Sequence, residues 1–237
     1  MSSSRRILLC TWGSYGDLFP YLAIAVRLKA LGHAPVLATC AYYRDLVEAA
    51  GVEFRAVVPD VDPTDAALIA RVMDPRRGTE VIVNEMIVPH VREAYEQLVA
   101  LVRDAEMVVT HPVTFAAPLA ARASKRRWLS GVLAPASMFS LTDFPVFPPA
   151  VNLMRLLRLT PWTARAFMGL ARRITGPWTM PVRNLARELD LEDTGDPLYE
   201  GQFSPHGTLA LFSPVLGRAQ ADWPPNTKAT GFVFHED

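Results

Sequence analysis

Short apolar runs alternate with amphipathic stretches along the first sixty positions of the chain. Three runs have the continuous apolar character of strands buried on both faces of a sheet: residues 7–11, 34–39 and 52–58. Between them, apolar residues recur at helical spacing over 21–31 and 43–50, and a glycine follows each of these stretches. Strands that alternate with helices at this pace predict right-handed crossovers between parallel strands. The expected fold class is therefore α/β, with a doubly wound, mostly parallel sheet.

The same alternation continues less regularly through the rest of the chain. Residues 83–101 have the apolar spacing of a long amphipathic helix, which Pro89 is expected to kink. A shorter helix is expected over 115–123, with Thr114 as its N-cap. Further strands are expected at four places: 107–110, 128–133, 208–212 and 230–234. A proline-rich loop and then a mostly helical insert, over about 150–192, interrupt this pattern.

Length and composition limit the classes of protein to consider. The chain has 237 residues, half of them hydrophobic and a fifth charged, which excludes intrinsic disorder and suits one large domain or two small ones. The 24 basic and 24 acidic residues cancel, so the overall charge does not indicate a nucleic-acid-binding protein. Cys10 and Cys40 lie in apolar stretches, which predicts two core thiols and a cytoplasmic protein. No apolar stretch approaches the ~20 residues of a membrane span.

One local asymmetry of charge remains within the neutral total. Residues 151–187 contain seven arginines and no acid, whereas residues 188–200 contain six acids and no base. The favoured interpretation is two solvated helix faces that pair with each other. The alternative is a basic, partly apolar surface, with Trp162 and Trp178, that makes weak contact with an anionic membrane surface or a lipid-like substrate.

The loop after the first strand is where this fold class predicts chemistry, because doubly wound sheets bind ligands at the carboxyl ends of their strands. The loop reads Thr-Trp-Gly-Ser-Tyr-Gly-Asp over residues 11–17, which fits neither the dinucleotide fingerprint nor a phosphate loop. Ser14 is interpreted as a turn hydroxyl, and Asp17 as either a helix N-cap or a general base. A capping carboxylate accepts backbone N–H groups, which lowers its pKa and weakens it as a base. The loop alone therefore favours the cap.

Motifs along nearly the whole chain resemble one family. Five segments carry the likeness: GSYGDLFP at 13–20, LGH at 31–33 with AT at 38–39, THPVTFAAPLA at 110–120, LAP at 133–135 with FS at 139–140, and DWP at 222–224 with TGF at 230–232. In this order they resemble the N-terminal domain of GT-B glycosyltransferases of the family 28 type. That group includes sterol glucosyltransferases, glycopeptide-antibiotic glycosyltransferases and the rhamnosyltransferase of rhamnolipid synthesis.

This resemblance implies a Rossmann-like, acceptor-binding N-terminal domain over residues 1–237, without the C-terminal domain that holds the nucleotide sugar in GT-B enzymes. It implies an inverting hexosyltransferase, whose co-substrate is a nucleoside-diphosphate sugar and whose acceptor is a hydroxyl of a lipid-like molecule or natural product. Neither a cofactor nor a metal is expected. Because the nucleotide-sugar domain is missing, the chain alone is expected to fold but not to turn over.

The resemblance also implies roles for individual residues. Asp17 becomes the catalytic base, which takes the proton of the acceptor hydroxyl. Three residues are implied to line the cleft and approach the donor phosphates: Gly13, Ser14 and Gly16. His111 follows the fourth strand and is either a polar wall of the acceptor pocket or a histidine bonded to local backbone. Phe139 is expected to bind substrate, on an apolar loop that extends to Phe147.

Other functions remain open at this stage. A non-catalytic auxiliary module that binds and stabilises a separate glycosyltransferase is one alternative, and a GT-B-shaped sugar-nucleotide epimerase is a weaker one. The other histidines suggest no metal site, because His90, His206 and His235 share no ligand spacing, and His33 is expected to be structural.

Overall fold

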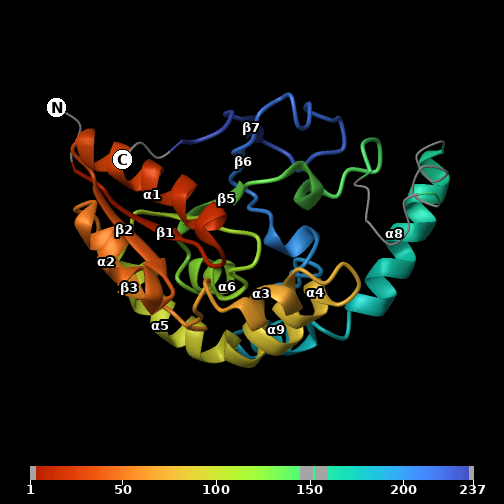
Figure 1. Ribbon diagram of the computed structural model, residues 1–237, viewed down its shortest axis with the longest axis horizontal. Coiled ribbons are helices and arrows are strands. Elements are labelled where there is room, and N and C mark those ends of the chain that lie inside the picture. Colours follow the sequence, from red (N-terminus) through yellow and green to blue (C-terminus); the bar gives the residue numbers. More distant parts are fainter. Residues whose placement is uncertain (1–3, 145–151, 153–159, 235–237) are drawn as a thin grey trace.

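The computed structural model describes residues 4–144, 152 and 160–234, and shows one parallel sheet with helices around it (Figure 1). The sheet has seven strands in the order β3-β2-β1-β4-β5-β6-β7, and every neighbouring pair is parallel. The strands are β1 Arg6–Cys10, β2 Ala34–Thr39, β3 Glu53–Ala56, β4 Met107–Thr110, β5 Arg127–Val132, β6 Thr208–Ala210 and β7 Thr227–Ala229. The predicted α/β, doubly wound fold class is confirmed.

The described helices fall between these strands and after β5. They are α1 Tyr15–Ala30, α2 Arg44–Ala49, α3 Ala66–Val72, α4 Gly78–Glu80, α5 Val91–Asp104, α6 Ala116–Ala123, α8 Pro161–Thr175 and α9 Met180–Glu188. Short 3₁₀ turns cover Ala41–Tyr43, Val88–His90, Pro135–Met138 and Glu200–Gln202, and a π-helical segment covers Val81–Ile87. The long helix expected over 83–101 is thus divided near Pro89, which cannot donate a backbone hydrogen bond.

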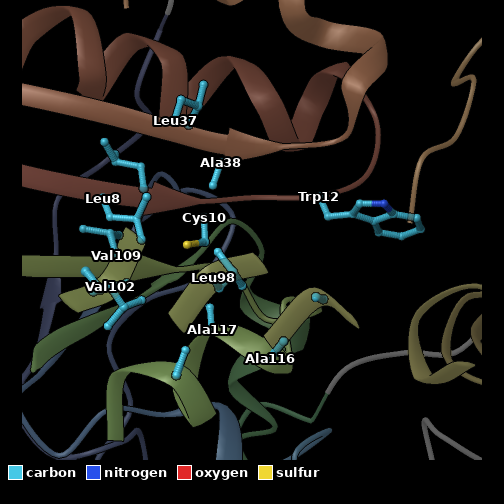
Figure 2. Packing of buried hydrophobic residues seen from close by; sticks show 14 of the residues in the cluster. Leu8, Cys10, Trp12, Leu37, Ala38, Leu98, Val102, Val109, Ala116 and Ala117 are labelled. Atoms are coloured by element: carbon cyan, nitrogen blue, oxygen red, sulfur yellow. The ribbon is translucent and has the colours of Figure 1, made fainter. Parts of the chain in front are cut away.

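The central strands are apolar because both of their faces are covered. Leu8 and Leu9 of β1 are almost completely buried. Figure 2 shows Leu37 of β2 pointing toward one face of the sheet, while Cys10 of β1 points toward Leu98 of α5 on the other face. Leu9 is in register with Leu37, so the successive residues Leu9 and Cys10 of β1 face opposite sides of the sheet. Both sides are covered, which explains continuous apolar runs rather than alternating ones. Both cysteines are buried and free, as predicted.

The order of the strands places a topological switch point between β1 and β4. From β1, the chain moves outward through β2 to β3, and then returns to place β4 on the opposite side of β1. The loops that follow β1 and β4 therefore open side by side at the carboxyl edge of the sheet. Crevices of this kind are where doubly wound sheets bind ligands.

Two predicted details are wrong. Residues 230–234 do not form the last strand, which is β7, in register with β6 through the pair Thr208 and Thr227. Thr114 does not cap α6, whose N-cap is Phe115. The Thr114 hydroxyl instead accepts the N–H of His111 at 3.1 Å and donates to the carbonyl of His111 at 2.7 Å.

The described part of the insert is helical, as predicted. Figure 1 shows α8 at the margin of the molecule, away from the sheet. It packs on a separate small cluster, in which Phe144, Met168 and Tyr199 are buried. Arg172 pairs with Glu200, and Arg183 pairs with Asp193 at 2.6 Å, so the expected pairing of the basic with the acidic segment holds for these two arginines, although neither acidic partner lies on an α-helix. Four features predicted for this region lie outside the described residues: Pro145–Pro149, Phe147, Arg155 and Arg158.

Candidate functional site

The loop after β1 is short and tightly turned because α1 begins earlier than its apolar pattern indicates. Tyr15 is the first helical residue, Ser14 occupies the N-cap position, and Asp17 lies in the first turn. The interpretation of Asp17 as the N-cap is therefore wrong. Its Oδ2 atom accepts the backbone N–H of Ser14 at 2.7 Å and the Ser14 hydroxyl at 2.8 Å. These two donors hold the carboxylate over the start of the helix.

Gly13 makes this arrangement possible. Its φ of +134° lies in the region that favours glycine, and a Cβ atom there would come within 2.3 Å of Asp17 Oδ2. The Gly13 carbonyl accepts the hydroxyl of buried Tyr43 at 3.0 Å, which anchors the turn from the β2 side. The glycine that the sequence placed in the cleft is thus required by the close approach of the carboxylate.

His111 follows β4 and meets Asp17 across the switch point. Its Nε2 atom lies 3.3 Å from Asp17 Oδ1, and its ring is almost completely buried. The ring packs edge-on against Tyr21, with centroids 5.8 Å apart, while the Tyr21 hydroxyl donates to the Thr110 carbonyl at 2.8 Å. Hydrogen bonds between the backbone of His111 and the Thr114 hydroxyl hold this residue on one side, and the ring of Tyr21 holds it on the other. The interpretation of His111 as a histidine bonded to local backbone is wrong for the imidazole: Nε2 faces Asp17, and Nδ1 is buried without a hydrogen-bond partner among the described residues. Its place in the lining of the predicted site agrees with the other interpretation, a polar wall of the acceptor pocket, which stays a prediction.

These neighbours determine the charge state of Asp17. Burial by itself raises the pKa of a carboxyl group, but the contact with His111 and the two hydrogen bonds from Ser14 outweigh it. The pKa of Asp17 is therefore held below its ordinary value, and the group is a carboxylate at neutral pH. Its side chain is still 31% exposed, so a ligand in the adjoining space can reach it.

The adjoining space is a cavity of about 300 Å³, called here the first cavity. Polar groups gather at one end of it, where Ser14, Asp17 and His111 lie. The other walls are apolar and come mainly from the chain between β3 and α5: Val61, Leu68, Ile69, Val72, Ile82 and Met86. The sequence did not identify this wall, because residues 60–80 show no clear periodicity. Trp12 lines the cavity as well, and its Nε1 atom donates to the Pro59 carbonyl at 2.8 Å.

Phe139 lies elsewhere. It lines a second cavity of about 490 Å³, between α8 and the turn that precedes α4. Its ring lies 4.8 Å from that of Tyr199, and its backbone φ is +50°, a value that non-glycine residues rarely adopt. Val113 lines both cavities. The structure therefore brings four of the predicted site residues together, with Phe139 in the neighbouring space, while Gly16 is not among the residues that line either cavity.

In the part of the chain that the structure describes, no group of three or more His, Cys, Asp and Glu side chains is placed to hold a metal ion. Within the same residues, no helix combines the length and the apolar composition that a membrane crossing requires.

Comparison with known proteins identifies relatives of the chain. Residues 7–123 match the glycosyltransferase family 28 N-terminal domain. The chain is 31% identical over 240 residues to O-mycaminosyltylonolide 6-deoxyallosyltransferase of Streptomyces fradiae, an alignment that covers 97% of this chain and 54% of that protein. A sterol 3-beta-glucosyltransferase of Arabidopsis thaliana is 49% identical over 49 residues, which are 21% of this chain and 8% of that enzyme.

A solved structure shares the fold over most of the chain. The crystal structure of the Streptomyces sp. SF2575 glycosyltransferase SsfS6, complexed with thymidine diphosphate, matches with a TM-score of 0.51 and 18% identity. The match covers 92% of this chain and 51% of that one. This chain thus spans about half the length of the S. fradiae relative and of SsfS6. Residues 7–123 thus match the glycosyltransferase family 28 N-terminal domain, and the Rossmann-like sheet of the chain is similar to that of GT-B glycosyltransferases.

Proposed function

We propose that the chain is the acceptor-binding domain of an inverting glycosyltransferase, in which Asp17 is the catalytic base. One observation carries this proposal. A carboxylate and an imidazole lie 3.3 Å apart at the polar end of an otherwise apolar cavity, at the switch point of the sheet. A general base must lie within hydrogen-bond reach of the proton that it removes, and the open side of Asp17 faces the space where a hydroxyl would enter.

The two oxygens of Asp17 have different surroundings, which suggests how the carboxylate acts. Oδ2 is engaged by two donors of Ser14, so the proton acceptor in our proposal is Oδ1, the oxygen beside His111. His111 Nε2 keeps Oδ1 oriented toward the cavity. A hydroxyl in the first cavity then donates its hydrogen to Oδ1, and the proton moves to Asp17 as the oxygen attacks the anomeric carbon of the sugar.

The remaining steps of the proposed reaction take place at the anomeric carbon of the sugar. The new bond joins the acceptor oxygen to the anomeric carbon, while the bond from that carbon to the phosphate oxygen breaks. The nucleoside diphosphate leaves with the electron pair from the opposite face, so the configuration of the carbon inverts. We propose that a nucleotide-sugar-binding domain outside residues 1–237 holds this donor. The thymidine diphosphate in SsfS6 supports the class of leaving group.

The apolar walls support the proposed class of acceptor. A cavity of about 300 Å³ lies at the lower end of the usual range for small-molecule sites, and polar groups at one end orient a single hydroxyl. The names of the matched relatives, a sterol glucosyltransferase and a transferase for O-mycaminosyltylonolide, agree with an apolar, hydroxyl-bearing natural product or lipid.

The experiment joins residues 1–237 to a nucleotide-sugar-binding domain of a GT-B relative. Sugar transfer from thymidine- and uridine-diphosphate hexoses to a panel of sterols and macrolide lactones is then followed by mass spectrometry. NMR of the product gives the configuration of the new bond, which should be opposite to that of the donor. Transfer that is equally fast with Asp17→Asn overturns the assignment of Asp17 as the base, whereas absence of transfer to every acceptor by the unsubstituted polypeptide favours the auxiliary role.

A further inference from the structure

The second cavity is lined mainly by large apolar and aromatic side chains. Seven large apolar and aromatic side chains line it: Phe139, Phe167, Leu170, Ile174, Trp178, Leu198 and Tyr199. Leu170 and Ile174 of α8 are 56% and 58% exposed, so this face of the helix is not covered by any described part of the chain. Contiguous exposed apolar surface of this kind usually marks a binding site.

A single charge interrupts this apolar lining. Among the described residues that line the second cavity, Arg76 alone is charged. Its backbone N–H donates to Asp74 Oδ1 at 2.7 Å, which fixes the turn before α4, but its guanidinium group forms no ion pair with any described residue. The neighbouring Arg77 differs, because its Nε atom lies 3.6 Å from Glu80 Oε2. Arg76 is thus a cation beside an apolar cavity, with its hydrogen-bond donors available to a ligand.

The two cavities lie next to each other. Val113 is two residues after His111 and contributes to both linings. A molecule whose hydroxyl lies at Asp17 and that is longer than the first cavity would reach the second cavity beside Val113. The volumes of about 300 and 490 Å³ lie within the range of small-molecule binding sites.

We propose that the second cavity binds the distal part of the acceptor, an apolar body that carries a negatively charged group, such as a carboxylate, in contact with Arg76. The apolar part replaces water on Phe167, Leu170 and Ile174, and the anion takes the donors of the guanidinium group. This ligand is an acceptor only if the proposed function is correct, but its binding to the chain does not depend on sugar transfer.

Two fluorescent probes with nearly the same apolar body separate the roles of charge and apolar contact. The first is 1-anilinonaphthalene-8-sulfonate, which is anionic, and the second is N-phenyl-1-naphthylamine, which is neutral. We expect Arg76→Gln to weaken binding of the anionic probe about fivefold and to leave the neutral probe unchanged, because a charge-assisted contact at a partly exposed site is lost. The matched control Arg77→Gln, beside Glu80, should change neither. Added salt should weaken the binding of the anionic probe alone, and only in proteins that retain Arg76.

A second pair of variants locates the probes. Ala171→Trp fills the second cavity from α8 and should weaken the binding of both probes about tenfold or more. Trp162→Ala lies on the same helix but outside the lining, and should leave the binding of both probes unchanged. If Ala171→Trp does not fold, Leu170→Gln at an already exposed position replaces it. The proposal is overturned if Arg76→Gln leaves the binding of the anionic probe unchanged. It is also overturned if Ala171→Trp, or Leu170→Gln in its place, leaves the binding of both probes unchanged. Because no turnover is measured, either result is independent of the test of Asp17.

Discussion

The two cavities hold the residues of the proposed site in different ways. Asp17 and His111 follow β1 and β4, two buried strands at the centre of the sheet, and neighbouring rings and backbone bonds fix both of them. Phe139 instead lies on a loop that the carboxylate of Asp222 holds from a distant part of the chain. Asp222 accepts the Ser140 hydroxyl at 2.7 Å and the Leu141 N–H at 2.6 Å, with further contacts to Thr142.

This difference determines how easily the residues of each cavity can move. Groups at the ends of buried strands cannot move without disturbing the core, which suits a base that must meet one hydroxyl in one geometry. A loop held by hydrogen bonds to an exposed carboxylate can change shape at much lower cost, which suits a wall that must fit the body of an acceptor. Variants of the strand-end pair should therefore change turnover, and variants of the loop should change affinity.

The largest expected effect is that of Asp17→Asn on turnover. Asparagine keeps an oxygen for the donors of Ser14, but it cannot accept the proton. In a polypeptide that includes a nucleotide-sugar-binding domain, we expect the turnover rate to fall at least about a hundredfold, with little change in melting temperature and acceptor binding. Turnover assays and thermal unfolding of both proteins measure these quantities.

Asp17→Ala serves as the control for the structural role of this residue. It removes the acceptor of the Ser14 N–H at the start of α1, so we expect it to lower stability as well as turnover, by about 1 kcal/mol. Ordinary turnover in the asparagine variant, with stability lost only in the alanine variant, would show that the carboxylate only stabilises the helix start.

Asp222→Ala should have an intermediate effect, on affinity rather than on turnover. Without this carboxylate, the segment after Phe139 loses its hydrogen bonds to residues 140–142, and we expect the KM for the acceptor to rise about three- to tenfold with kcat little changed. The expected loss of unfolding free energy is about 1–2 kcal/mol at neutral pH. Asp222→Asn, which retains one acceptor oxygen, should lie between the two proteins.

The stability difference should also depend on pH. Burial raises the pKa of Asp222, but the hydrogen bonds from Ser140, Leu141 and Thr142 outweigh it and hold the pKa below its ordinary value. A carboxyl group with a lowered pKa in the folded state stabilises the protein above the pKa of the unfolded chain, near pH 4, and this contribution is lost as the pH falls further. Denaturant unfolding at pH 7 and below pH 4 checks this. An equal difference at both pH values would contradict it.

The sequence predicted the strand-end region well because its information is local. Continuous apolar runs identify buried strands, and the carboxyl-edge rule then places the residues after β1 and β4 at one site. The start of α1 was misplaced, because Tyr15 and Gly16 do not continue its apolar pattern. The close approach of Gly13 to Asp17 that fixes the turn also depends on atomic distances, which no periodicity reveals.

Two other features could not be predicted in the same way: the apolar walls of the first cavity, and the clamp that Asp222 forms on residues 140–142 through its hydrogen bonds. Residues between 61 and 86 form a wall of the first cavity, mainly through α3 and a π-helical segment, whose short lengths give no clear period. The clamp joins Asp222 to Ser140 across 82 positions, and such a contact between polar residues has no signature in a single sequence. The positions of Phe139 and Arg76 at a second cavity follow only from the packing of α8.

A smaller effect is expected from His111→Gln on the titration of Asp17. Glutamine retains an N–H donor but not the imidazole, so part of the influence that lowers the pKa of Asp17 is lost while burial still raises it. The pKa should therefore rise, and the acid limb of kcat/KM should move to higher pH with it. ¹³C NMR of the Asp17 carboxyl follows this in the chain alone. An unchanged titration would show that Ser14 by itself sets the charge state.

The smallest expected effect concerns the insert and a membrane surface. Arg172 and Arg183 are neutralised by acidic partners, so less positive charge is free than the seven arginines of residues 151–187 indicate. Exposed charges attract anionic lipid weakly, and salt screens them over about 10 Å at 0.1 M. We expect weak co-sedimentation with phosphatidylserine vesicles at low salt, which disappears near 0.15 M salt, and none with phosphatidylcholine vesicles. Removal of the two acidic partners, in Asp193→Asn with Glu200→Gln, should strengthen binding because it frees both arginines. Binding that is absent at low salt in both proteins would mean that the insert does not contact membranes, and that its exposed apolar residues act only in the second cavity.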